Sequence, residues 1–163
     1  MSLDHDFLLL PEGKVNYTDY AKYFRRSCDL NSSRLIIDYD LISYLNDTLK
    51  WVPTLNPANP KDNLKEWQGY GLNLYGPTII NKQGAEVFHH VVWSWAQLFS
   101  KAPAKLQLTG SWMSDIDDEG VESEPYYEQL EFDRDMVVNN LITLATYADK
   151  TCSGDFFILH LGI

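Results

Sequence analysis

The stretch that most constrains this chain runs from Gly84 to Pro103, GAEVFHHVVWSWAQLFSKAP. At 100° per residue, its large apolar side chains fall within about 140° of arc, as on a helix that packs against a core. This apolar face comprises Val87, Phe88, Val91, Val92, Trp95, Leu98 and Phe99. The opposite arc carries His89, His90 and Trp93. A solvent-facing helix surface normally carries no indole, so Trp93 marks this arc as a candidate binding surface.

Two weaker helical patterns precede this helix. Apolar side chains recur at helical spacing from Asn16 to Arg26, and again from Asp38 or Asp40 to Lys50. These patterns predict two N-terminal helices, which form an N-terminal helical part of about residues 1–52.

Proline and asparagine alternate over residues 53–63, a composition typical of an irregular surface loop. Two short helices alone cannot bury their apolar faces, so this loop is not a predicted domain boundary. The length of 163 residues and the apolar content of 45% fit one core. We therefore expect a single domain over residues 1–163.

From about residue 68 onward, the apolar periodicity alternates between that of a strand and that of a helix. It predicts strands at Tyr70–Tyr75, 105–113, 126–132 and 156–161, and a second helix capped by Asp133. With the helix over 84–103, the order is strand, helix, strand, strand, helix, strand. This is the βαββαβ pattern of a ferredoxin-like fold. The predicted fold class is thus α+β: a ferredoxin-like sheet over about 68–163 with two helices on one face, preceded by the two N-terminal helices.

Two strands carry specific expectations. In the strand over 105–113, Leu106, Leu108 and Trp112 alternate with smaller or polar residues. The final run FFILHL shows no polar alternation, which indicates a strand inside the sheet. His160 within that run is predicted to be a hydrogen-bonded core or sheet residue.

Nearly all of the net charge lies in one segment. The chain has a formal charge of −10, and residues 115–135 hold ten acidic residues against one base, Arg134. This local patch predicts a surface that attracts a basic protein partner. Nucleic acid and anionic membranes are not expected partners, because phosphate attraction needs clustered lysine and arginine. The other interpretation is a solvated hairpin loop followed by a helix N-terminus that favours acids.

The acidic segment also partly matches a calcium loop. Asp115, Asp117, Glu119 and Gly120 occupy its positions 1, 3, 5 and 6. Position 12 is Tyr126 where the loop needs a bidentate glutamate, and the flanks are predicted strands. No metal is therefore expected in this segment.

The sequence carries no familiar catalytic motif. His89 and His90 are adjacent, so they point about 100° apart and cannot share one metal as histidines four residues apart do. No nucleophile elbow, Walker A lysine or complete dinucleotide glycine pattern is present. No cofactor is expected.

The start MSLDHDFLLLPEG lacks the basic residues and the length of a signal peptide, and no apolar stretch reaches 18 residues. The sequence thus predicts a soluble, cytoplasmic protein. Cys28 and Cys152 lack metal-ligand spacing and are expected to be free thiols.

These features predict a non-enzymatic protein-binding module. Its small, acidic, aromatic-rich profile resembles that of bacterial immunity proteins, which implies neutralisation of a basic partner such as a nuclease toxin. The candidate partner-binding residues are Asp115, Asp117, Asp118, Glu119, Glu122, Glu124, Trp93, His89 and Tyr147. Trp93 and Tyr147 lie off the apolar faces of their helices, so either they bind the partner or the N-terminal helices cover them. The alternative function is a small metal-dependent or small-molecule-binding enzyme that uses His89, His90 and the acidic segment.

Overall fold

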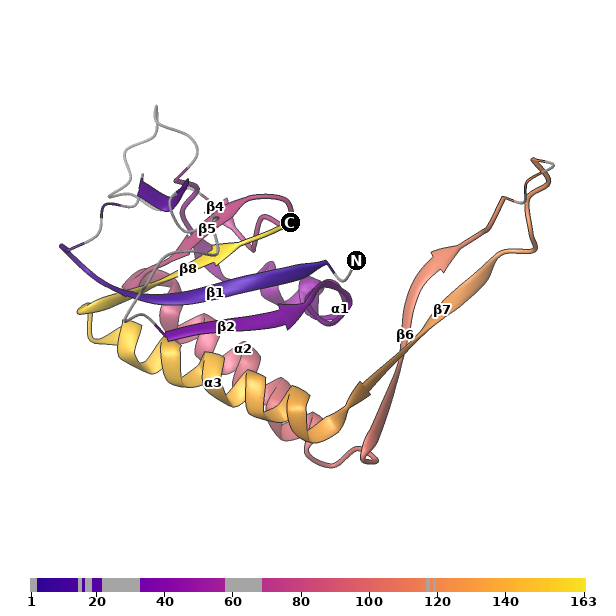
Figure 1. The fold of residues 1–163 in the computed structure, drawn as a ribbon. Helices are drawn as coiled ribbons and strands as arrows, with labels where there is room; N and C mark the ends of the chain where they lie inside the picture. The colour runs from indigo at the N-terminus through magenta and orange to yellow at the C-terminus, as the bar shows by residue number, and fades with distance from the viewer. Residues whose placement is uncertain are drawn as a thin grey trace.

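The centre of the fold is a four-stranded antiparallel sheet with strand order β2-β1-β8-β5 (Figure 1). Its strands are β1 (Asp4–Pro11), β2 (Ser33–Asp38), β5 (Pro77–Ile80) and β8 (Phe156–Leu161). Leu8 of β1 lies opposite Leu159 of β8, and Leu159 lies opposite Ile79 of β5. The sheet therefore joins the beginning of the described chain to its end.

This computed structural model has an α+β fold. It describes residues 3–14, 16, 19–21, 33–57, 69–116, 118 and 120–163.

Two long helices, α2 (Lys82–Phe99) and α3 (Arg134–Cys152), lie side by side along one face of the sheet (Figure 1). They run in opposite directions, so the end of α2 lies near the start of α3. The shorter α1 (Tyr39–Leu49) follows β2 directly, and the Asp38 carboxylate caps it by accepting a hydrogen bond from the Asp40 N–H at 2.8 Å. None of the helices in the described part of the chain is long and apolar enough to cross a lipid bilayer.

The central strands β1 and β8 are buried on both faces. Along β1, Phe7 and Leu9 belong to the cluster that packs against the helices, whereas Leu8 and Leu10 belong to a second cluster on the other face. Alternate residues of a strand point to opposite faces, so a strand in such a position needs a continuous apolar run. The runs FLLL in β1 and FFIL in β8 meet this requirement. The prediction that FFILHL lies inside the sheet is confirmed.

The prediction that the chain begins with two helices is wrong, because β1 and β2 come first. The second predicted helix exists and is α1. Only Asn16 and residues 19–21 of the first are described, and residues 19–21 form a single 3₁₀ turn. Cys28 lies outside the described residues.

Cys152 is a free cysteine near the end of α3, as predicted. Burial, and then the negative charges of Asp149 and Glu86, raise the pKa of its thiol. The thiolate that would react as a nucleophile is therefore disfavoured.

The predicted strand Tyr70–Tyr75 is also wrong. Of these residues, only Tyr70 lies in a strand, because β4 (Gly69–Tyr70) is short and pairs with β3 (Pro53–Thr54). β3 occupies the first two residues of segment 53–63, which the sequence predicts to be an irregular loop. Gly71 then adopts a φ of 84° and the chain turns, which ends β4. The strand of the main sheet in this region is β5.

The ferredoxin-like topology is wrong because two predicted sheet strands leave the sheet. β6 (Lys105–Met113) and β7 (Tyr126–Asp133) pair only with each other. In the half of each strand next to the helices, the buried side chains of Leu106, Leu108 and Leu130 alternate with exposed ones, so neither strand could take a central position that is buried on both faces. The strands β1 and β2 take their place in the sheet.

The helix over 84–103 is confirmed as α2, which begins two residues earlier than predicted. Asn81 caps it by accepting a hydrogen bond from the Gln83 N–H at 3.0 Å. Phe88, Val92 and most of the predicted apolar face are buried, but Leu98 is exposed. Leu98 lies in the last turn of α2, next to the departing β6.

We predict that Gly84→Ala destabilises the protein by about 1 to 3 kcal/mol, although alanine is the better helix former. A Cβ at position 84 would lie 2.1 Å from the Pro53 carbonyl oxygen, a backbone atom that cannot rotate away. Urea unfolding of both proteins measures the effect. Gln83→Ala, at an exposed position of the same turn, is the control and should change stability by less than about 0.5 kcal/mol. A stabilised Gly84→Ala protein would show that α2 does not pack this closely on β3.

Candidate functional site

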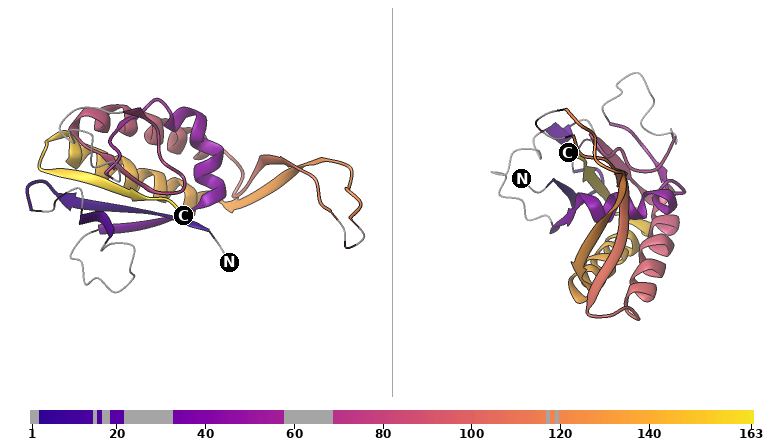
Figure 2. Two further views of the ribbon diagram at one scale, coloured as in Figure 1. Left: turned by 90° about the horizontal axis from the view of Figure 1, so that it is seen from above. Right: turned by 90° about the vertical axis from the view of Figure 1, so that its right-hand side faces the viewer.

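A two-stranded hairpin projects from the fold beyond the end of α2 and the start of α3 (Figure 1). We call β6, β7 and the residues that connect them the arm. The left view of Figure 2, from above, also shows that the arm stands clear of the sheet and the helices. Leu106, Leu108 and Leu130 are buried at its base and belong to the core cluster of the helices. The arm is therefore anchored at the body and extends away from it.

A bulge in β6 changes which side chains share a face of the arm. Thr109 pairs with Gln129 and Trp112 pairs with Tyr127, so β6 has one residue more than β7 between these pairs. Gly110 lies in the bulge, where a Cβ would come within 3.0 Å of side chains of β7. The extra residue reverses the alternation beyond it. Trp112 consequently leaves the face that its spacing from Leu108 predicts.

The arm exposes large apolar side chains on both faces. Trp112 and Tyr127 are 60% and 56% exposed, and their rings form a T-shaped pair with centroids 4.7 Å apart. Met113 and Tyr126 form the next pair in the register, so they point to the opposite face, and both are exposed. Single exposed apolar residues are ordinary, but a cluster of large ones marks an interaction surface.

Near the outer end of the arm lie the predicted acidic residues that the structure describes. Asp115, Asp118, Glu122 and Glu124 are all exposed. Asp117 and Glu119 lie outside the described residues. The Tyr126 hydroxyl donates a hydrogen bond to Asp115 Oδ2 at 3.0 Å, and Ser114 Oγ donates one to Glu122 Oε1 at 2.6 Å. The bond to Asp115 raises the pKa of the Tyr126 hydroxyl.

Asp115 and Glu122 have hydroxyl partners, and none of the four carboxylates has a cationic partner in the described part of the arm. The one ion pair found there joins Lys105 Nζ to Glu131 Oε2 at 2.6 Å, and it lies at the base. The outer part therefore presents a negative charge that no described residue of the arm balances.

A cleft of about 210 Å³ separates the base of the arm from α1. Asp40, Ser43 and Tyr44 of α1 line one side, and Glu128 and Leu130 of β7 line the other. Burial raises the pKa of Asp40, and the negative charges of Asp38 and Glu128 raise it further. The cleft therefore disfavours added negative charge.

The structure does not bring Trp93 and His89 together with the acidic residues. Trp93 lies on α2 in the body, is 41% exposed and stacks on His89 with ring centroids 6.1 Å apart. His89 Nε2 lies 3.4 Å from Asp149 Oδ1 of α3. The acidic residues lie on the arm, which projects away from both helices (Figure 1). Of the two alternatives for Trp93, the structure shows exposure, but on a different surface from the acidic residues.

The sequence leaves open whether Tyr147 contacts a partner or is covered, and the structure shows it buried, so it cannot serve as a partner-binding residue. Tyr147 is only 6% exposed and belongs to the core cluster of α2, α3 and the sheet. Because α3 packs against both α2 and the sheet, its buried arc is wider than the apolar spacing of its sequence indicates.

His89 and His90 do not form part of a metal site among the described residues. Their rings lie edge to face with centroids 5.6 Å apart, and no group of three or more potential ligands occurs in the described ranges. His90 instead lines an apolar pocket of about 290 Å³ with Trp51 and Trp95. The Trp95 indole N–H already donates a hydrogen bond to Thr48 Oγ1 at 2.9 Å.

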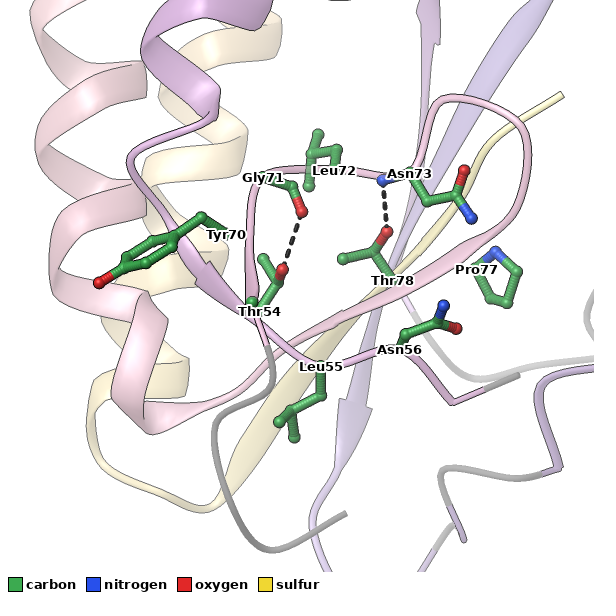
Figure 3. Close-up of a pocket in the computed structure, with 10 residues that line it drawn as sticks. Thr54, Leu55, Asn56, Tyr70, Gly71, Leu72, Asn73, Pro77 and Thr78 are labelled. Carbon is green, nitrogen blue, oxygen red and sulfur yellow. Dashed lines mark hydrogen bonds between the residues drawn. The ribbon is translucent and has the colours of Figure 1, made fainter. Parts of the chain in front are cut away.

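A further crevice of about 250 Å³ lies between β3, β5 and the residues after β4 (Figure 3). The Thr54 hydroxyl donates a hydrogen bond to the Gly71 carbonyl oxygen, and the Thr78 hydroxyl oxygen accepts one from the Asn73 N–H, each at 2.8 Å. Both threonines thus hold the turn that follows β4, which is a structural role.

No protein-family model, curated protein or solved structure matches this chain significantly. The function of the arm can therefore be inferred only from its own geometry.

Sequence reasoning missed the aromatic residues of the arm. Trp112, Met113, Tyr126 and Tyr127 read as ordinary strand residues, because large apolar side chains in strands usually face a core. The available signal was their position beside ten acidic residues, since a strand next to so dense a charge is rarely buried on both faces.

We predict that Tyr147→Ala lowers the free energy of unfolding by about 3 kcal/mol or more, because it leaves a cavity between α2 and α3. Trp93→Ala should change it by less than about 1 kcal/mol, since the ring only stacks on His89 at the surface. Urea unfolding of the two variants compares a buried with an exposed aromatic residue. Equal losses would contradict this assignment.

Proposed function

We propose that this chain is a protein-binding module whose arm binds a basic protein partner. One observation carries the proposal: the arm combines exposed aromatic side chains on both faces with carboxylates that have no cationic partner among the described residues. Neither the exposed aromatic residues nor the carboxylates belong to the hydrophobic core of the described structure. A partner that covers the arm would bury the aromatic side chains and neutralise the carboxylates.

The two features have different energetic roles. Trp and Tyr are the most frequent anchors of protein interfaces, so Trp112 and Tyr127 supply affinity. Exposed charges mainly speed and orient the encounter, so Asp115, Asp118, Glu122 and Glu124 supply association rate and choice of partner. Because both faces carry apolar side chains, a cleft in the partner accommodates the arm better than a flat surface does.

The specific form of the proposal is an immunity or inhibitor protein that neutralises a nuclease toxin. A nuclease binds phosphates, so its substrate cleft is basic. A narrow, negatively charged arm fits such a cleft and competes with the nucleic acid for it. The shape and charge of the arm support this form.

The enzyme alternative has weaker support. It needs His89, His90 and the acidic segment in one site, whereas the described acidic residues lie on the arm and both histidines lie on α2. His89 is also engaged with Asp149. We therefore do not propose this alternative.

The partner to test first is the protein encoded by the neighbouring reading frame, because inhibitors and their targets are commonly expressed together. It should be basic, should cleave nucleic acid and should lose that activity in equimolar mixture with this chain. A neighbour that is acidic, or whose nuclease activity persists at saturating concentration, contradicts the neutralising function.

We predict that neutralising the arm slows association with this partner. The variant Asp115→Asn, Asp118→Asn, Glu122→Gln, Glu124→Gln should associate about tenfold more slowly in 50 mM salt. The difference should shrink near 0.5 M salt, where a Debye length of about 4 Å screens exposed charges. Stopped-flow fluorescence across a salt series measures both effects.

The matched control neutralises four exposed acidic residues of the body: Asp47, Glu86, Asp149 and Asp155. It changes the net charge equally, so it separates the arm from the overall charge. If both variants slow association to the same extent, the arm has no special role.

We predict that the double variant Trp112→Ser, Tyr127→Ser raises the dissociation rate at least tenfold at both salt concentrations, because it removes apolar anchors and no charge. Leu98→Ser, at an exposed apolar position outside the arm, is the control. Dissociation rates that match the wild type would show that the aromatic pair lies outside the interface.

A further inference from the structure

Two histidines meet inside the sheet, away from the arm. His5 on β1 and His160 on β8 are both fully buried, and His5 Nδ1 lies 2.7 Å from His160 Nε2. Their rings stack with centroids 4.9 Å apart, and the Tyr39 ring of α1 stacks on His5 at 5.6 Å. The Phe7 ring lies against His160 at 4.8 Å. The prediction that His160 is a hydrogen-bonded core residue is confirmed.

The hydrogen bond leaves the pair incomplete. A neutral imidazole has one N–H donor and one acceptor nitrogen, and the contact uses a donor of one ring and an acceptor of the other. The outer nitrogens, His5 Nε2 and His160 Nδ1, are buried and have no hydrogen-bond partner among the described residues. In either tautomer, one of them is an unused acceptor. Such a group is costly to bury, and it is the atom that an incoming proton would occupy.

The surroundings hold the pair in its neutral form at pH 7. Burial lowers the pKa of His5 from 6.5 to about 4, against the opposing effects of Asp38, Asp4 and Asp6. Burial, and then the neighbouring His5, lower the pKa of His160 well below its ordinary value. A protonated ring would place a charge between two strands and α1, where water does not reach it.

The elements around the histidine pair place charged and polar side chains near it. On β1, Asp4 and Asp6 flank His5, and Arg34 of β2 pairs with Asp6. Asp38 lies at the junction of β2 and α1. The Tyr39 hydroxyl lies 3.3 Å from the Tyr75 hydroxyl of the turn after β4.

On β5, Thr78 lies opposite His160, and its hydroxyl accepts a hydrogen bond from Asn73 N–H. Asp40, whose pKa is raised by burial, follows Tyr39 in the first turn of α1.

We propose that the His5–His160 pair is a pH switch that holds the first turn of α1 on the sheet at neutral pH and releases it in acid. Proton uptake by one ring forms an imidazolium that reaches water only if Tyr39 leaves its stacked position. Asp40, Ser43 and Tyr44 follow Tyr39 and line the cleft at the base of the arm. Release of this turn would therefore also widen the cleft between α1 and the base of the arm.

The direction and range follow from the two protonation states. In the released state a histidine has its ordinary pKa of about 6.5, so it binds a proton more readily than in the closed state. Each pH unit below 6.5 favours the released state about tenfold, until the closed state is also protonated near pH 4. At pH 5 the release equilibrium should have shifted about 30-fold relative to pH 7.

Hydrogen exchange followed by NMR tests the proposal. After correction for intrinsic rates, the protection of amides 43–46 in α1 should fall about 30-fold from pH 7 to pH 5, and that of mid-α2 and mid-α3 amides less than threefold. The double variant His5→Phe, His160→Phe should abolish the difference, because it keeps the ring stack and removes the ionisable nitrogens. The control His89→Gln, His90→Gln should retain it. Equal loss in all elements, or a loss that the Phe variant retains, overturns the proposal.

A second measurement decides the question if the Phe variant does not fold. Imidazole ¹⁵N shifts of the wild-type protein report the charge of each ring directly. His5 and His160 should keep the shifts of neutral rings down to about pH 5 in the closed state. Shifts of charged rings at pH 6 in the folded protein would overturn the proposal.

Discussion

The fold depends on the pairing of β1 with β8, which brings residues 4–11 beside residues 156–161 in the middle of the sheet. Both strands are apolar on both faces, so each contributes to the cluster under the helices and to the cluster on the other side. β2 and β5 extend this pair, and α2 and α3 cover one of its faces. Apolar burial of this kind is the dominant stabilising term in a domain. Without the central pair of strands, neither apolar cluster has a sheet surface to pack against.

The sequence predicted the local elements better than their arrangement. All three helices of the structure, and β6, β7 and β8, lie close to the predicted positions. Periodicity reports which side of an element is apolar, but it does not report which strand becomes the neighbour. The run FLLL is short and is followed at once by Pro11 and Gly13, which favours no strand there, yet β1 begins earlier, at Asp4. The buried residue near that end of β1 is His5. This polar side chain interrupts the apolar pattern by which a core strand is recognised in a sequence.

The candidate site was predicted in part. The charge of residues 115–135 is a property of the sequence alone, and the structure places all of its described acidic residues except Asp135 on the arm. The aromatic half was missed because a one-residue bulge reverses the facing of Trp112, and a bulge at Gly110 has no periodic signature. Tyr147 was a candidate binding residue but is buried, because its burial depends on how α3 packs between α2 and the sheet. Both errors arise from tertiary geometry that spacing along one element does not contain.

The pairing of β1 with β8 also determines the order in which a newly made chain can fold. Contacts between α2, the arm and α3 are local, whereas the two histidines of the central strands lie 155 positions apart. Contacts so distant in sequence form late and slow the whole reaction. During synthesis, β1 leaves the ribosome long before β8 exists. The edge of β1 that pairs with β8 therefore stays unpaired during that time. The helices and the arm can assemble in that interval, but the sheet closes only when the last strand arrives.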